Sequence, residues 1–351
     1  MPFAFCLSPS AADAATWEKQ RTGTFAWLHA VFFVDERRGW AAGGKGALLS
    51  TADGGATWER RKPPTEDAVR DIFFHDAETG WLLCERSMFK PMAKDESVSY
   101  LLKTTDGGAS WSRVEVTRGA DVDLKLAGLR FADREHGWVF GELGSLFFTS
   151  DGGGSWTRQR VPTRHLLLGA TFLDAQTGWL SGGGLTVLKT TDGGASWRAG
   201  TVFLPAGVEG EQEPRETRPG PGEPGWNESR VVGGRRLNAV WFASPERGWA
   251  VGGEGVIIAT DDGGRTWRPQ RSGVGDDLHD VRFFDEAEGW AVGRGGATLH
   301  TRDGGRTWAD AKRATTHALE RLFTVGRRAW AAGFGGTIVA LKVEGGGSRD
   351  E

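Results

Sequence analysis

Residues 104–111 read TTDGGASW, and close copies of this stretch occur five more times along the 351-residue chain. All six copies fit T-x-D-x-G-x-x-W, and the other five span residues 51–58, 149–156, 190–197, 260–267 and 301–308. A short Asp side chain accepts backbone N–H bonds in a tight turn, and Gly takes positive φ without strain. The Trp then buries a large ring. The repeat therefore predicts a strand, a tight turn and a second strand in each copy.

The six aspartates of these turns could be catalytic or metal-binding only if their carboxylates converged on one point. They recur instead once per structural unit, so we interpret them as structural turn residues. The seven His residues show no metal-ligand spacing, and we expect neither a metal nor a cofactor. The aspartates are Asp53, Asp106, Asp151, Asp192, Asp262 and Asp303.

The composition favours an all-β protein. The chain has 17 Trp, 19 Phe and 54 Gly but only one Tyr, which is typical of short, aromatic-packed strands joined by Gly-rich turns. A second landmark, Gly-Trp, recurs with a basal spacing of 41 residues. This period matches a four-stranded propeller blade. The seven landmark tryptophans, the last preceded by Ala329, are Trp40, Trp81, Trp138, Trp179, Trp249, Trp290 and Trp330.

A phenylalanine lies six residues before the Gly or Ala of each landmark, and we expect it in the core. The series comprises Phe33, Phe74, Phe131, Phe172, Phe242, Phe283 and Phe323. Two residues earlier the chain carries an apolar residue in six copies, which is the spacing of a strand with one inward face. The seventh copy has Arg321 at that place.

Each unit then consists of strand A with the Phe, strand B after Gly-Trp, strand C before the Asp turn and strand D after it. Seven landmarks but six Asp turns leave the last unit without a strand D. Residues 16–20, TWEKQ, repeat the pattern of residues 57–61, TWERR. We therefore predict a seven-bladed β-propeller over residues 15–343, closed by the N-terminal strand, which leaves no open sheet edge. We expect residues 344–351 to be a disordered tail.

Bulk properties exclude several classes of partner. The net charge of −3, from 43 basic and 46 acidic residues, does not favour nucleic acid. Two cysteines support no disulfide framework, and no apolar run is long enough to span a bilayer. Residues 1–14 lack a basic start but end in Ala12-Asp13-Ala14, so we expect a remnant signal segment or a disordered terminus. The first would indicate export to the periplasm or beyond, and the second a cytoplasmic protein.

Two long intervals between landmarks predict insertions, at about residues 84–100 and 205–236. In a propeller the B–C turns and D–A connections share one rim, and both insertions belong to it. Variable loops gathered on one face mark a recognition surface. We expect one exposed aromatic ring there. The basic residues of this rim either form one continuous patch or are divided by Glu142, Glu254 and Glu320, and we favour a positive arc interrupted near blade seven. The candidate binding residues are His29, Lys45, Arg70, Arg235, Arg236, His279, Arg294 and Phe334.

Taken together, Gly-Trp, G-G-x-G and T-x-D-G-G-x-[ST]-W resemble the BNR/Asp-box repeat propellers, and specifically the photosystem II stability/assembly factor-like group. The resemblance covers residues 17 to about 343. It implies a seven-bladed, non-enzymatic scaffold that holds a polypeptide, such as a subunit of a membrane complex, on a propeller surface with a basic patch. We expect a monomer.

The alternative function is a glycoside hydrolase or carbohydrate-binding propeller, since Asp-box propellers include sialidases. A sialidase-like site needs a Tyr nucleophile, and Tyr100 is the only tyrosine. A two-carboxylate glycosidase could use Asp71 and Asp280 if they faced each other at about 5–10 Å.

Overall fold

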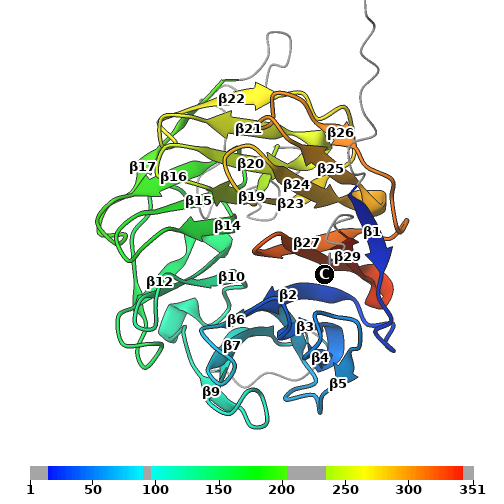
Figure 1. Cartoon of the computed structure of the whole chain (residues 1–351). Helices are drawn as coiled ribbons and strands as arrows, with labels where there is room; N and C mark the ends of the chain where they lie inside the picture. The colour runs from blue at the N-terminus through cyan, green and yellow to red at the C-terminus, as the bar shows by residue number, and fades with distance from the viewer. Residues whose placement is uncertain (1–14, 88, 90–95, 204–234, 343–351) are drawn as a thin grey trace, which may run out of the picture.

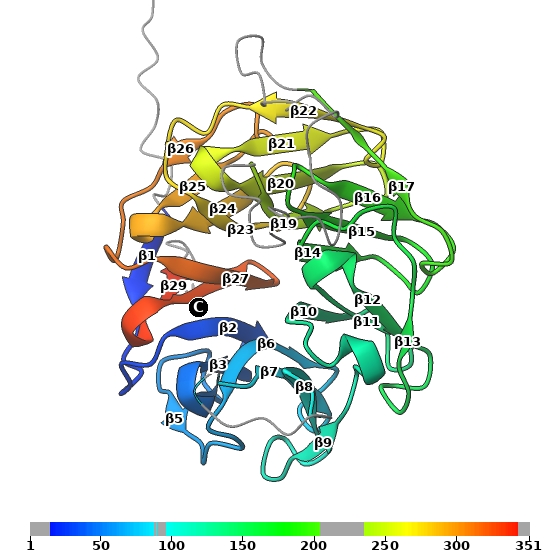
Figure 2. The same cartoon turned by 180° about the vertical axis from the view of Figure 1, so that it is seen from behind.

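The protein is a ring of seven antiparallel sheets around a central axis (Figures 1 and 2). The computed structural model describes residues 15–87, 89, 96–203 and 235–342. The predicted segments at 1–14 and 344–351, and most of the insertion at 205–236, lie outside these described residues. Within them, no helix is long and apolar enough to cross a membrane.

Each blade runs from an inner strand A at the axis to an outer strand D. The A strands are β2 (Leu28–Phe33), β6 (Ala68–Phe74), β10 (Leu126–Phe131), β14 (Leu167–Phe172), β19 (Leu237–Phe242), β23 (Leu278–Phe283) and β27 (Leu319–Val325). The B strands are β3 (Gly39–Gly43), β7 (Gly80–Glu85), β11 (Gly137–Gly141), β15 (Gly178–Gly182), β20 (Gly248–Gly252), β24 (Gly289–Gly293) and β28 (Arg328–Gly333).

The outer half of each blade is shorter. The C strands are β4 (Leu48–Thr51), β8 (Ser99–Thr104), β12 (Leu146–Thr149), β16 (Val187–Thr190), β21 (Ile257–Thr260), β25 (Thr298–Thr301) and β29 (Ile338–Lys342). The D strands are β5 (Glu59–Arg60), β9 (Ser112–Val114), β13 (Thr157–Arg158), β17 (Arg198–Ala199), β22 (Thr266–Gln270), β26 (Ala309–Asp310) and β1 (Thr16–Lys19).

Single 3-10 turns follow five of the B strands, and one more lies between blades two and three. They are η1 (Gly44–Gly46), η2 (Gly119–Asp121), η3 (Glu142–Gly144), η4 (Gly253–Gly255), η5 (Arg294–Gly296) and η6 (Phe334–Gly336). The Gly-rich runs of the sequence are therefore B–C turns.

Strand β1 pairs antiparallel with β29, from Thr16 opposite Lys342 to Lys19 opposite Val339. The first strand of the chain thus supplies strand D of the last blade, and the ring has no open edge between its ends. The prediction of a seven-bladed propeller closed by the N-terminal strand is confirmed.

The core lies between neighbouring blades and is built from the repeated aromatic residues. Trp40 of blade one stacks on Phe74 of blade two, with ring centroids 3.8 Å apart, and Trp111 meets the same Phe74 edge-on. Trp249 and Trp308 sandwich Phe283 in the same way. Offset-stacked and edge-on pairs suit the quadrupoles of aromatic rings. Six of the seven blade contacts pair a landmark Trp with a Phe of the series, whereas at the contact between blades six and seven Trp290 meets Trp17 edge-on.

The seventh blade departs from the predicted register. Its A–B hairpin pairs Val325 with Arg328, which is a tighter turn than in the other blades, so Phe323 lies opposite Trp330. In blade one the residue opposite Trp40 is Phe32, and the member of the Phe series is the next residue, Phe33. The prediction that Phe323 occupies the same place as the other members of the series is therefore wrong. Phe323 is partly buried and packs against the core between blades seven and one, with its ring 4.6 Å from that of Phe32. Leu322 takes the buried apolar place that was assigned to Arg321.

Two details outside the basal repeat also differ from the sequence prediction. The first insertion is shorter than 84–100, because Cys84 pairs with Tyr100 within a hairpin that extends β7 and β8. The chain after blade four forms β18 (Thr201–Val202), which pairs parallel with β22 as a fifth strand of blade five. Neither the longer β7–β8 hairpin nor the added strand β18 could be predicted from the 41-residue repeat.

Candidate functional site

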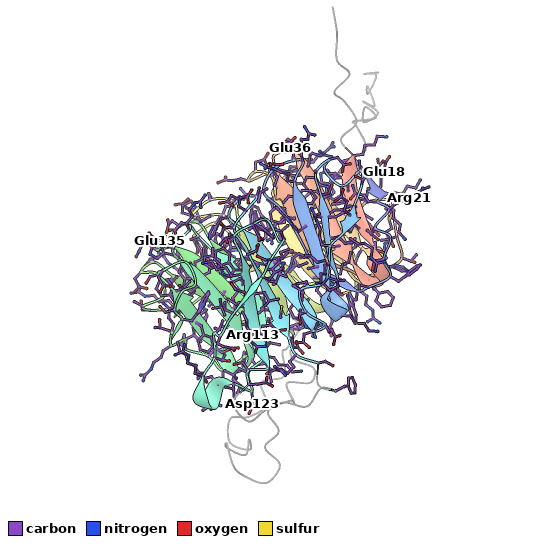
Figure 3. All side chains as sticks on the ribbon, turned by 90° about the horizontal axis from the view of Figure 1, so that it is seen from below. Glu18, Arg21, Glu36, Arg113, Asp123 and Glu135 are labelled. Carbon is purple, nitrogen blue, oxygen red and sulfur yellow. The ribbon has the colours of Figure 1, made fainter. Side chains whose placement is uncertain are left out.

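The loops of the ring form two rims. The B–C turns touch the D–A connections: Gly336 N–H donates to Ala26 O at 2.7 Å. The Asp turns touch the A–B loops on the other side: Gly54 N–H donates to Arg37 O at 2.7 Å. Figure 3 shows Glu36 of an A–B loop on the opposite side of the ring from Asp123 of a D–A connection. We call these the insertion-bearing rim and the Asp-box rim.

Each Asp turn is closed by its own side chains. In the first, the Thr51 hydroxyl donates to Asp53 Oδ1 at 2.8 Å, and Thr57 donates its N–H and hydroxyl to the two carboxylate oxygens. These bonds, first among them the hydroxyl of Thr57, lower the pKa of Asp53 to about 2. The same bonds occur in the other five turns. A carboxylate occupied in this way supports its turn and does not point at a shared site.

Two other aspartates lie near the axis, and neither is on the rim surface where the sequence placed them. Asp71 is buried and accepts N–H bonds from Ile72 and from Leu129 of the next blade. Its Oδ2 also lies 2.7 Å from Arg130 and 3.6 Å from Arg321. Burial alone would raise the pKa of Asp71, but the two guanidinium groups and the bond from Leu129 hold it below its ordinary value.

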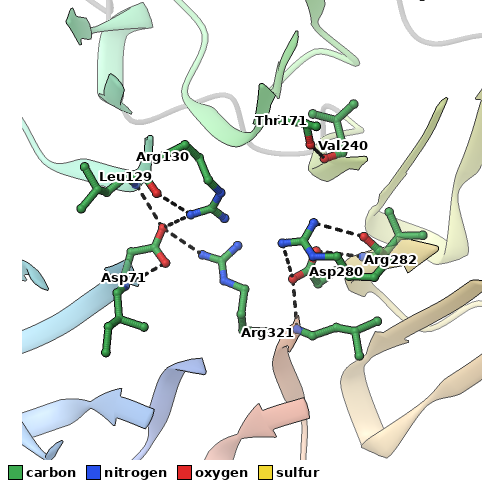
Figure 4. A network of polar contacts seen from close by, with 11 residues as sticks. Asp71, Leu129, Arg130, Thr171, Val240, Asp280, Arg282 and Arg321 are labelled. Atoms are coloured by element: carbon green, nitrogen blue, oxygen red, sulfur yellow. Dashed lines mark hydrogen bonds and ion pairs between the residues drawn. The ribbon is translucent and has the colours of Figure 1, made fainter. Parts of the chain in front are cut away.

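Asp280 makes the equivalent contacts between blades six and seven. It accepts N–H bonds from Val281 and Leu322 and lies 3.5 Å from Arg282. Figure 4 shows Asp71 and Asp280 each turned toward a neighbouring inner strand, with guanidinium groups between them. Both carboxylates thus bind adjacent blades together. A general acid needs a raised pKa, and Asp71 has a lowered one, so this pair does not match glycosidase chemistry.

The only tyrosine is also built into the fold. Tyr100 is 3% exposed, and its hydroxyl donates to Asp67 Oδ2 at 2.8 Å beside Thr65. Burial raises the pKa of Tyr100. A nucleophile needs access to substrate and an ionisable oxygen, and Tyr100 has neither.

Most of the basic residues predicted on the insertion-bearing rim already have partners. Arg70 Nε lies 2.8 Å from Glu85, and Arg235 lies 3.6 Å from Glu254. Arg236 lies 3.5 Å from Asp277. Exposed pairs of this kind cancel much of the local positive potential. Ion pairs therefore divide the basic arc beyond the interruption that was expected near blade seven.

The two predicted histidines lie on inner strands and are partly buried. Burial, and then Arg70, lowers the pKa of His29 to about 4, so its ring is neutral at pH 7. His279 Nδ1 lies 2.9 Å from Leu319 O of the next blade, and 3.8 Å from Glu320. His279 thus serves the contact between blades six and seven, whereas the ring of His29 packs 5.3 Å from that of Trp27.

Three of the predicted residues remain open to a partner. Lys45 of η1, Arg294 of η5 and Phe334 of η6 are exposed, and within the described ranges neither cation has an ion pair. They lie on equivalent B–C turns of blades one, six and seven, which are consecutive around the ring. The structure therefore places these three residues on one arc of the insertion-bearing rim.

Sequence reasoning missed two neighbours of Phe334. The connection between β1 and β2 brings Phe25 and Trp27 to the same part of the rim. The rings of Trp27 and Phe334 lie 5.4 Å apart, edge to face. Two aromatic residues in the short connection at residues 20–27 were the available signal.

The described residues hold no group of three or more His, Cys, Asp or Glu that could bind a metal ion. Cys84, which is the cysteine within the described ranges, is buried, and burial raises the pKa of its thiol. A reactive thiolate needs the opposite environment. The exposed groups on the insertion-bearing rim are consequently cations and aromatic rings, which suit a contact surface.

The fold and its six Asp turns define an Asp-box repeat propeller with seven blades. Within that class, the chain belongs to the family described as photosynthesis system II assembly factor YCF48, whose model matches residues 9–84, 62–164 and 223–320. No curated protein matches the chain.

Several solved structures share the fold. "YCF48 bound to D1 peptide" is 19% identical with a TM-score of 0.70, covering 96% of this chain and all of that one. YCF48 from Cyanidioschyzon merolae is 18% identical with a TM-score of 0.67, covering 93% of this chain and 98% of that one. A GH74 xyloglucanase from Xanthomonas campestris is 14% identical with a TM-score of 0.61, covering 93% of this chain and 53% of its own length.

Proposed function

We propose that this protein is a non-enzymatic assembly or stability factor that binds a polypeptide on its insertion-bearing rim. Family membership supports the assembly role, and a protein of the same fold and family name has been solved with a D1 peptide. The partner proposed here is a polypeptide segment of a membrane-complex subunit. The predicted candidate residues that carry the proposal are Lys45, Arg294 and Phe334.

The observation that carries this proposal is the contrast between paired and unpaired charges. Arg70, Arg235 and Arg236 are neutralised within the rim. Lys45 and Arg294 are exposed cations without an ion pair within the described ranges, on either side of the exposed ring of Phe334. Interfaces combine aromatic anchors with charges that set orientation and association rate. The arc through blades six, seven and one has this composition.

Binding can be measured on an array of 15-residue peptides that tile the D1 protein. We expect the wild-type protein to bind a subset of these peptides. A Lys45→Asn/Arg294→Ser variant should associate several-fold more slowly, and the difference should shrink as salt is raised. Lys45 has a φ of 54°, a conformation that Asn tolerates, so the change removes charge without strain.

The matched control carries two substitutions on the Asp-box rim, Arg37→Ser and Arg306→Ser, which also remove two exposed cations. It should bind as the wild type does. Equal slowing by both variants would mean that net charge, and not the insertion-bearing rim, drives association. Absence of any binding by the wild type, together with hydrolysis of glycosides in a broad screen, would replace the proposal with the enzymatic alternative.

A further inference from the structure

We propose that Phe25, Trp27 and Phe334 form an aromatic patch that binds an apolar side chain of the partner polypeptide next to a carboxylate held by Lys45. The inference rests on the proposed function and deepens it, because it names the anchor and the chemistry of the segment. An apolar residue followed within a few positions by an acidic residue is the segment that fits.

Exposure sets this group of rings apart. Seven large apolar side chains of the described residues are exposed, and three of them are in the patch. Phe25 is 94% exposed, Trp27 45% and Phe334 49%. The rings of Trp27 and Phe334 meet edge to face at 5.4 Å, and the backbone of Phe25 lies against Gly336, two residues after Phe334. Contiguous apolar surface on a soluble protein marks a site of contact.

The backbone holds the patch in place before any partner arrives. Gly336 N–H donates to Ala26 O at 2.7 Å, and the Thr22 hydroxyl donates to Gly336 O at 2.7 Å. A Cβ on Gly336 would lie 1.8 Å from Thr24 O, so only glycine allows this approach of the two loops. Gly44 N–H donates to Trp27 O at 2.8 Å. Rings fixed in this way cost little conformational entropy on binding, which favours a role as anchors.

Charge beside the patch identifies the neighbouring group on the partner. Gly44 ties the patch to η1, and Lys45 follows it directly with an exposed ammonium group that has no ion pair within the described ranges. His317 lies against Phe334 on the other side, and its Nδ1 is 2.8 Å from the Thr337 hydroxyl, so its ring is already engaged. A cation at one end of an apolar surface favours a carboxylate beside an apolar side chain.

Two other occupants fit these observations less well. A second copy docking symmetrically through the patch would bring two Lys45 side chains into one interface, where like charges repel. A nucleic-acid strand could stack on the rings, but it would need a track of cations along its phosphates, and the chain carries a net charge of −3. A polypeptide needs only the single cation.

The test uses an array of 12-residue Gly-Ser peptides with one variable central residue and Asp, Asn or Lys two positions after it. Wild-type protein should prefer Leu, Phe or Trp at the centre with Asp after it. Phe334→Ser and Trp27→Ser should each weaken binding to these peptides at least about tenfold. Lys45→Asn should keep the apolar preference and lose the discrimination between Asp and Asn.

The matched control is Phe203→Ser, because Phe203 is 47% exposed but lies beside Arg268 at the outer edge of blade five. It should bind the peptides as the wild type does, and unchanged melting temperatures would show that all variants fold. Binding that is equal in the wild type and the Phe334→Ser variant would overturn the inference while leaving the proposed function intact. If the wild type bound the array of D1 peptides and the Gly-Ser array equally poorly, both would fall.

The same variants decide between occupants. Concentration-dependent dimerisation of the wild type that Phe334→Ser abolishes would assign the patch to a second copy and overturn the inference. Tighter binding of a labelled 12-nucleotide oligothymidine than of any peptide would overturn it in favour of nucleic acid. A wild-type protein that stays monomeric and binds peptide in preference to the oligonucleotide supports it.

Discussion

A chain that lacks residues 1–21 should melt roughly 5–10 °C below the full-length protein. The deletion removes β1, and with it the buried ring of Trp17, which packs edge-on against Trp290 at 5.3 Å. Loss of a buried Trp costs about 3–5 kcal/mol. An unfolding entropy of about 2.1 cal/mol/K per residue makes 1 kcal/mol worth about 1.4 °C in a chain of 351 residues, so the ring alone accounts for about 4–7 °C and the lost strand pairing adds to it. It also removes Gln20, whose Oε1 accepts the indole N–H of Trp58 at 2.9 Å.

The matched control is a deletion of residues 1–14, which keeps β1 and should melt as the full-length protein does. Trp17→Ala keeps the strand and loses the ring, so we expect it to fall between the two. Differential scanning calorimetry of all four proteins checks the order. If the chain that lacks residues 1–21 melted at the same temperature as the full-length protein, the result would contradict closure of the ring by β1.

Asp71→Ala should destabilise the protein by about 3–5 kcal/mol, because the substitution leaves two partly buried arginines without the buried carboxylate that they face. Arg130 and Arg321 both face Asp71 near the axis, and the Leu129 N–H loses its acceptor. Urea unfolding at pH 7 measures the loss. Asp123→Ala, at an exposed position of a D–A connection, is the control and should change little. A destabilisation below about 1 kcal/mol by Asp71→Ala would contradict a structural role for the network.

The pH dependence gives the same prediction an independent check. Because the folded pKa of Asp71 is lowered, its contribution to stability is present above the unfolded pKa of about 4 and is lost as the pH falls. The difference in stability between the wild type and Asp71→Ala should therefore be full at pH 7 and shrink on acidification below pH 4. A difference independent of pH would indicate that packing, and not charge, is what the substitution removes.

The repeat made the fold predictable from sequence, and its one local failure has a physical cause. The bonds inside the Asp turn recur in all six copies, and a landmark Trp packs on a Phe at six of the seven blade contacts, so the copies reinforce one another. Phe323 has the correct distance from Ala329 but not the correct register, because the hairpin of blade seven is closed at Val325 and Arg328. Counting residues along the chain cannot detect a tighter turn. Arg321 was the visible sign of the shift, since it broke an apolar series.

The rim could be predicted from the place of the insertions, whereas the state of its charges could not. Arg70 and Glu85 belong to neighbouring strands of one blade, and their pairing depends on side-chain geometry. A reversal of Arg70 to Glu would therefore place two carboxylates together and disturb the fold, which makes Lys45 the better position for a charge test. Asp71 was predicted on the rim because its strand begins there, but a bulge in β6 between Val69 and Asp71 precedes its burial.

The central claim is that a polypeptide binds the insertion-bearing rim, and hydrogen exchange with a bound peptide tests it most directly. The peptide is the tightest binder on the D1 array, and amide exchange is compared with and without it at saturation. The account predicts slower exchange in residues 22–28 and in η1 and η6, with unchanged exchange in the six Asp turns. Protection confined to the Asp turns and the A–B loops would place the partner on the opposite rim and contradict the claim.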